Sequence, residues 1–233
     1  MRLQLNPSVP EISLVNSDSL DEAVAQLIVA LTPGGGGFNY LRATKVAKAA
    51  YKGFHNLSHL VAARNLHDGS VGAVANLEVA NMVCPVSFGR RTQVIDIPSK
   101  SFQYGANRHA SFRVPFLFLE EKTVKSYFLQ PRKRTVYTEK QVGIFASIVK
   151  KYLLDTEFYG EKVDIEFVEA SERVLGQGRE LRVQRLSDID IVSDEVLAKH
   201  LSVVQDALKI IENENLVTKK RRPLRDRDLP LFF

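Results

Sequence analysis

Apolar residues recur every three or four positions in several segments of the chain, which is the spacing of an amphipathic helix. The segment 19–31 is the clearest early example, because Ser19 and Glu22 also form a capping box at its start. On the same grounds we expect further helices at about 41–52, 56–66, 139–154 and 194–212. Helical segments are therefore predicted at both ends of the chain.

The middle of the chain has a different pattern, in which β-branched and aromatic residues dominate and Gly, Pro and Asn interrupt them. We expect a hairpin that turns at Glu120 to Lys122, and Pro115 indicates that its first arm is an edge strand or contains a bulge. The expected strands lie near 71–79, 82–88, 92–97, 110–119 and 123–129, with two more within 162–171 and 179–186.

The order of these elements predicts an α+β fold with a mostly antiparallel central sheet, flanked by N-terminal and C-terminal helices. We expect a mainly helical N-terminal part over residues 1–68 and an α+β main domain over residues 69–215. Residues 216–233 are expected to form a flexible basic tail with an apolar C-terminus. The length of 233 residues allows a core of normal size.

The composition is that of an ordinary globular protein, with 45% hydrophobic and 25% charged residues. No apolar run reaches the roughly 18 residues of a membrane span, and the first residues lack the apolar region of a signal peptide. The single cysteine, Cys84, excludes an internal disulfide framework. We therefore expect no membrane association and a cytoplasmic location, or a nuclear one in a eukaryote.

Positive charge is segregated along the chain, and this changes the functional picture. The formal net charge is +5, and residues 23–67 contain no Asp or Glu but five Lys or Arg. Four of the five fall three or four residues apart and form one stripe on a helix. Segregated charge of this kind indicates contact with nucleic-acid phosphates, without sequence specificity. The residues expected to make it are Arg42, Lys45, Lys48 and Lys52 in the stripe and Arg132, Lys133 and Arg134 in a second cluster.

Aromatic and histidine residues suggest two further sites. Tyr127 and Tyr137 flank the second basic cluster, an arrangement that single-strand binders use for base stacking. His55 and His59 have the spacing of two metal ligands on a helix, but Asn56 stands where a helical metalloprotease needs Glu. We expect neither a metal site nor a cofactor.

Acidic residues support an enzyme as the alternative. Asp164 and Glu166 are two positions apart and so lie on the same side of one expected strand, and Glu180 lies on the next strand. Metal-dependent nucleases use carboxylates on neighbouring strands in this way to bind a divalent cation. Such nucleases often have a lysine two residues after a carboxylate, and here that position holds Arg182, which is a poor base. The alternative hypothesis is therefore a metal-dependent nuclease.

The last residues, Asp226 to Phe233, resemble the short peptides with which replication and repair proteins bind sliding clamps. Such peptides carry a glutamine, an aliphatic anchor and one or two aromatic anchors, and here aspartate replaces the glutamine. The resemblance implies a protein partner such as a sliding clamp, whereas folding back onto the protein's own surface or a dimer contact would satisfy the same pattern. The anchor residues would be Leu229, Leu231, Phe232 and Phe233.

These observations favour a non-catalytic accessory or adaptor protein that binds nucleic acid through its basic clusters and a protein partner through its tail. A structural subunit with only protein contacts is the third hypothesis. The sequence leaves the formation of homo-oligomers open.

Overall fold

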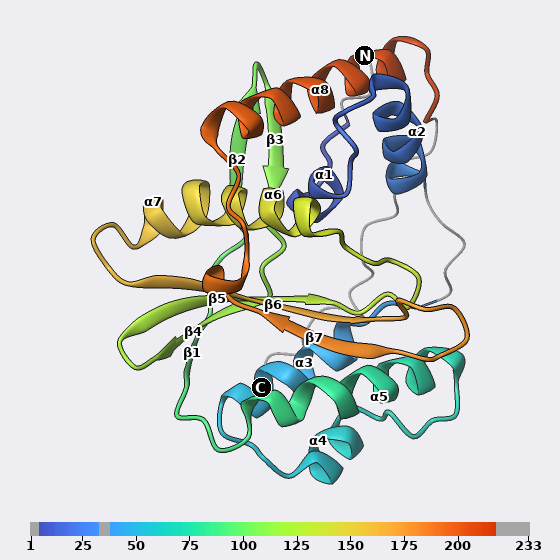
Figure 1. Ribbon diagram of the computed structural model, residues 1–233. Helices are drawn as coiled ribbons and strands as arrows, with labels where there is room; N and C mark the ends of the chain where they lie inside the picture. The colour runs from blue at the N-terminus through green and yellow to red at the C-terminus, as the bar shows by residue number, and fades with distance from the viewer. Residues whose placement is uncertain (1–4, 33–37, 218–233) are drawn as a thin grey trace.

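The computed structural model describes residues 5–32 and 38–217 of the chain. A central β-sheet separates two layers, as Figure 1 shows: one layer of helices below it, and a second layer above it that contains helices and a small hairpin. Each layer packs its own cluster of buried side chains against the sheet. We call the two layers the lower and the upper layer.

The central sheet has five strands in the order β1-β4-β5-β6-β7. All neighbouring pairs are antiparallel except β5 and β6, which are parallel. A parallel pair needs a crossover connection, and α6 (Glu139–Val149) with the turns that follow it provides one. The strands are β1 (Gln93–Ile95), β4 (Phe116–Glu120), β5 (Thr123–Gln130), β6 (Val163–Ser171) and β7 (Glu180–Gln184).

The lower layer packs small residues and one tyrosine against aromatic side chains of the sheet. Ala47 and Ala50 let α3 approach the sheet closely, and Tyr51 contacts the rings of Phe116 and Phe118. The elements of this layer are α3 (Leu41–Tyr51), α4 (Leu57–Ala63), α5 (Val71–Val83) and the short 3₁₀ turn η1 (Cys84–Ser87).

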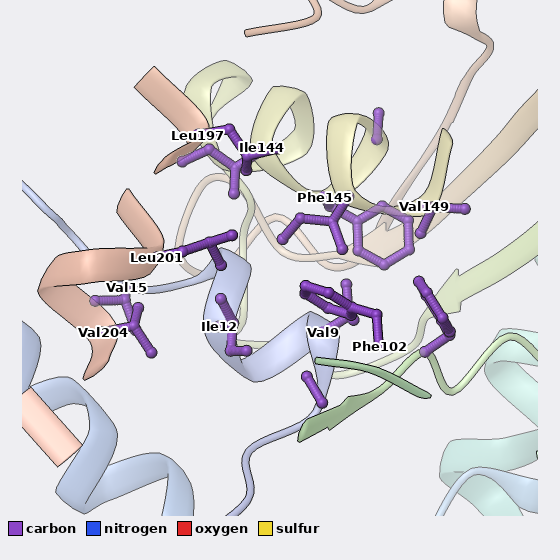
Figure 2. Close-up of a cluster of buried hydrophobic side chains, with 14 of the residues drawn as sticks. Val9, Ile12, Val15, Phe102, Ile144, Phe145, Val149, Leu197, Leu201 and Val204 are labelled. Atoms are coloured by element: carbon purple, nitrogen blue, oxygen red, sulfur yellow. The ribbon is translucent and has the colours of Figure 1, made fainter. Parts of the chain in front are cut away.

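The upper layer forms the larger cluster of buried side chains. Phe145 of α6 packs on Phe128 and Phe167 of the sheet, while Ile12, Phe102 and Leu201 come from three other elements (Figure 2). The elements are α1 (Val9–Ser13), α2 (Leu20–Leu31), the strands β2 (Ser101–Gly105) and β3 (Arg108–Ser111), α6 (Glu139–Val149), the π-helical turn η2 (Lys150–Leu154), α7 (Asp155–Glu157), the 3₁₀ turn η3 (Leu186–Asp188) and α8 (Asp194–Asn213).

The α+β fold is confirmed, as are the mostly antiparallel sheet and the flanking helices. The strands expected at 71–79 and 82–88 are wrong, because this stretch forms α5 and η1. Its valines are typical of strands, but Ser70 accepts a hydrogen bond from the backbone N–H of Ala73 and so caps a helix. Ala73, Asn76 and Ala80 are buried at helical spacing on that helix.

The expected hairpin is also confirmed, but its first arm is neither an edge strand nor bulged. β4 lies between β1 and β5, with an uninterrupted register to both. Pro115 precedes the strand, so it removes no hydrogen bond from the sheet. Glu121 and Lys122 make the turn with positive φ angles of 49° and 64°, which suits the twist of a two-residue hairpin.

The described residues before position 69 contribute to both layers. The helices α1 and α2 pack in the upper layer, whereas α3 and α4 lie below the sheet. The domain boundary near residue 68 stays a prediction. Within the residues that the structure describes, no helix is both long and apolar enough to cross a membrane.

We expect the substitution Gly143→Ala to destabilise the protein, although alanine forms helices better than glycine by about 1 kcal/mol. An added Cβ at this position of α6 would lie 2.4 Å from the backbone oxygen of Asp190. A clash with backbone cannot relax by rotation of a side chain, so a net loss of about 1–3 kcal/mol is expected in urea unfolding. Lys199→Ala on the exposed side of α8 is the control and should change stability by less than about 0.5 kcal/mol. A stabilised Gly143→Ala variant would contradict the close packing.

Candidate functional site

A network of charged side chains lies between the sheet and the lower layer, centred on Glu166 of β6. The Glu166 side chain is fully buried. The hydroxyl of Tyr51 donates to its Oε1, and Arg90 donates to both carboxylate oxygens at 3.1 and 2.8 Å. Tyr51 is the last residue of α3 and Arg90 follows η1, so one carboxylate binds two segments of the lower layer to the sheet. Burial is the main reason why the pKa of Tyr51 is raised well above its ordinary value.

Arg90 also forms a bidentate ion pair with Glu120 at the end of β4. The two nitrogen–oxygen distances are 2.8 and 2.7 Å. Hydrogen bonding to Arg90 is the first reason why the pKa of Glu120 falls from 4.5 to about 2. The ionised carboxylate therefore stabilises the fold above pH 4.5, and this contribution is lost as the pH falls toward 2.

Lys125 of β5 closes the network on its other side. Its Nζ lies 3.0 Å from Oε2 of Glu120 and 3.5 Å from Oδ2 of Asp164 on β6. The other carboxylate oxygen of Asp164 accepts hydrogen bonds from the backbone N–H groups of Ile165 and Leu186. All three carboxylates of the network are thus paired with cations of the same chain.

The structure brings together two of the three carboxylates proposed for a nuclease. Asp164 and Glu166 lie on one face of β6, whereas Glu180 is exposed on β7 opposite Ser171. Ser171 lies five positions after Glu166 on the strand, a distance of about 16 Å. Among the described residues, no group of three or more His, Cys, Asp or Glu side chains is arranged to hold a metal ion. The nuclease alternative stays a prediction.

The basic stripe forms on α3 as expected, and two of its members have acidic neighbours. Arg42 pairs with Asp68 at 2.9 Å, and its side chain remains 44% exposed. Lys48 pairs with Asp96, whose carboxylate is 66% exposed. Lys52 caps the end of the helix and is exposed, and Lys45 is partly exposed in the middle of the stripe. These side chains follow one side of the lower layer.

The second basic cluster lies near the start of the same helix. Arg132, Lys133 and Arg134 are exposed in the loop after β5, and Lys133 lies 3.4 Å from Glu172. The buried Arg179 links this loop to α3, because it donates to the carbonyl of Pro131 at 2.7 Å and to the hydroxyl of Tyr40 at 2.9 Å. It donates also to the carbonyl of Ala170 and to Glu78 of α5.

The tyrosines expected to stack on bases are wrong for that role. Tyr127 is fully buried and Tyr137 is 2% exposed, so neither ring can meet a base. Three phenylalanines that the sequence pattern did not single out are exposed instead: Phe38 (40%) before α3, Phe54 (63%) after α3 and Phe88 (36%) after η1. The sequence signal was a ring, a glycine and a basic residue at the end of a helix, as in Lys52-Gly53-Phe54. Gly53 turns the chain there with φ +96°.

Charge differs strongly between the two layers. Residues 38–91, which form the lower layer and its connections, contain seven Lys or Arg and two Asp or Glu. Residues 5–31 of the upper layer contain four Asp or Glu and no Lys or Arg, and α8 contains four acidic and two basic residues. The lower layer is therefore the more basic side of the described part of the molecule.

The proposed anchors of the tail, Leu229, Leu231, Phe232 and Phe233, lie outside the described residues. The same holds for the flexibility expected of residues 218–233. The described part of the chain ends at Val217, which is buried in the upper layer.

We expect Arg90→Met to destabilise the protein by about 3–5 kcal/mol in urea unfolding at neutral pH, because it leaves Glu166 buried without a cation. The double variant Arg90→Met/Glu166→Gln should recover part of this loss, since it removes the uncompensated charge as well. Arg42→Met is the control, because its partly exposed ion pair with Asp68 should contribute about 0–1 kcal/mol. Equal losses for Arg90→Met and Arg42→Met would show that the network is not buried as described.

The site therefore consists of a closed ion-pair network beneath an open surface of basic and aromatic side chains. Comparison of the chain with protein-family models, with curated proteins and with solved structures gives no match.

Proposed function

We propose that this protein is a nucleic-acid-associated accessory or adaptor factor whose lower layer binds backbone phosphates without reading the sequence. The observation that carries the proposal is the charge difference between the layers. Seven basic and two acidic residues lie in the lower layer and its connections, whereas acidic residues predominate in the helices α2 and α8 of the upper layer. Nucleic-acid phosphates are the polyanion that a soluble factor most often meets with such a surface.

The binding surface follows α3 from one end to the other. The helix has 11 residues and is therefore about 16 Å long, enough to lie beside several phosphates of one strand. The loop with Arg132 to Arg134 extends the surface at the first turn of the helix, and Lys52 extends it at the last. The contacts are long side chains from one helix face and one loop, so they position a backbone but do not read bases.

The ion pairs of Arg42 and Lys48 moderate this affinity but do not abolish it. Arg42 is partly exposed, as is the Asp96 partner of Lys48, so water and salt screen both pairs. A phosphate that approaches either cation replaces a weak intramolecular contact. We therefore expect modest affinity that depends strongly on salt.

The proposal includes a protein contact through the C-terminal tail. Its support is the sequence alone: the apolar anchors Leu229, Leu231, Phe232 and Phe233 follow a run of arginines and resemble a clamp-binding peptide. An apolar peptide of this kind fits a hydrophobic groove of a partner. Together the two contacts would bring a protein partner to nucleic acid.

The first test measures binding of a labelled oligonucleotide by fluorescence anisotropy between about 50 and 200 mM salt. We expect the logarithm of the affinity to fall linearly with the logarithm of the salt concentration. Lys45→Gln/Lys48→Gln/Lys52→Gln should weaken binding and reduce the slope by about 2, since each lost phosphate contact contributes about 0.7–0.9. Binding that is absent or insensitive to salt would contradict the proposal.

The matched control removes the same charge from the upper layer, with Lys140→Gln/Lys199→Gln/Lys209→Gln. Both triple variants have the same net charge, so a difference between their affinities must come from the position of the removed charges. Equal weakening by the two would mean that net charge alone attracts the nucleic acid. Cleavage of the oligonucleotide with Mg²⁺ that Asp164→Ala abolishes would favour the nuclease alternative instead.

A second test concerns the tail. Phe232→Ala/Phe233→Ala should abolish binding to a purified sliding clamp while the free energy of unfolding changes by less than about 0.5 kcal/mol. The clamp itself is the probe, and Leu175→Ala on the exposed β6–β7 turn is the control for loss of surface apolar area. A clear loss of stability without any clamp binding by the wild type would show that the tail docks on its own protein.

A further inference from the structure

Two phenylalanine side chains are exposed at one end of the basic lower layer. Phe54 lies 63% exposed just after α3, and Phe88 lies 36% exposed just after η1. The ring of His55, the neighbour of Phe54, packs on the ring of Phe88 with a centroid distance of 5.2 Å. The rings of His55 and Phe88 therefore join two separate segments, and the exposed ring of Phe54 is the chain neighbour of this pair. We call Phe54, His55 and Phe88 the aromatic platform.

Basic side chains flank the aromatic platform on both segments. The hydroxyl of Thr92 donates to the backbone carbonyl of Tyr51 at 2.5 Å and so holds the two segments together. Lys52 follows Tyr51 in the chain and Arg91 precedes Thr92, and both Lys52 and Arg91 are exposed. Asp96 lies close enough to lower the local positive charge, but it is paired with Lys48.

The ion-pair network between the lower layer and the sheet holds the aromatic platform in place. Arg90 points inward and binds Glu120 and Glu166, while its neighbour Arg91 is exposed. Tyr51 likewise binds Glu166, and its neighbour Lys52 is exposed. The backbone that carries the platform is thus bound to the central sheet through buried side chains. Exposed rings on a fixed backbone lose little conformational freedom when a ligand packs on them.

We propose that the aromatic platform stacks the bases of single-stranded nucleic acid while Lys52 and Arg91 hold its phosphates. The inference rests on the proposed function and names its ligand. Aromatic rings beside cations are the chemistry that unpaired bases recognise, whereas a duplex hides its bases from such rings. Four large aromatic residues of the described chain are exposed: Phe38, Phe54, Phe88 and Tyr159. Phe54 and Phe88 lie within three positions of the exposed Lys52 and Arg91, and Phe88 packs on the ring of His55. Phe38 packs on Tyr40 instead, and Tyr159 lies between Glu157 and Glu161. A hydrophobic protein surface is the other candidate occupant, but the charge around the rings favours a polyanion.

The test compares single strands of about 20 nucleotides, oligothymidylate and oligouridylate, with a duplex of the same length and with an abasic strand. The wild type should bind both single strands more tightly than the duplex or the abasic strand. Phe54→Ala and Phe88→Ala should each weaken single-strand binding by about five- to one-hundred-fold and leave abasic-strand binding unchanged. Lys52→Gln and Arg91→Gln should weaken binding to the intact and the abasic strand alike.

The controls separate stacking from loss of structure. Phe54 is largely exposed, so Phe54→Ala should keep the wild-type unfolding midpoint. Tyr159→Ala removes a ring that is 92% exposed outside the lower layer, and it should bind all probes as the wild type does. Unchanged affinity of Phe54→Ala and Phe88→Ala, with salt-dependent binding preserved, would overturn the platform and leave the proposed function intact. Failure of the wild type to bind any of the strands would overturn both.

Discussion

The burial of one carboxylate, that of Glu166, organises the lower layer. Removing an ionised carboxylate from water costs several kcal/mol unless cations and hydrogen-bond donors replace the lost hydration. Here the hydroxyl of Tyr51 and the guanidinium of Arg90 replace it. Because these two residues come from different segments, the end of α3 and the turn after η1 must both approach β6 for the charge to be satisfied. The position of the exposed residues next to them follows from this requirement.

Local patterns were sufficient to predict most of the fold. The capping residues Ser19, Thr138 and Ser193 lie at the starts of helices, and the Glu120–Lys122 turn joins two strands. The residue pattern led to a wrong prediction over Val71–Val83, where solvent-exposed valines at positions 71 and 74 favoured a strand. Their branching raises β propensity, yet the buried alanines on the other side of the segment decide its structure, since they allow close helix packing.

The candidate site was harder to predict, because its partners are distant in sequence. Lys125 and Asp164 are opposite each other only in the parallel register of β5 and β6. Arg90 and Glu120 belong to a loop and a strand end, and nothing local indicates that they pair. The basic residues of α3 were predictable because one helix contains them all. The rings were not, since sequence composition does not tell a buried tyrosine such as Tyr127 from an exposed phenylalanine such as Phe54.

Arg179 restricts the motion of three segments relative to one another. Its planar guanidinium donates in several directions at once, to two backbone carbonyls, to the hydroxyl of Tyr40 and to Glu78. A lysine, with a single compact charge, could not hold these four groups in their places. The start of α3, the side of α5 and the loop after β5 are therefore one mechanical unit. A ligand that touched the loop and the helix together would not have to order one relative to the other, so little of its binding energy would be lost as entropy.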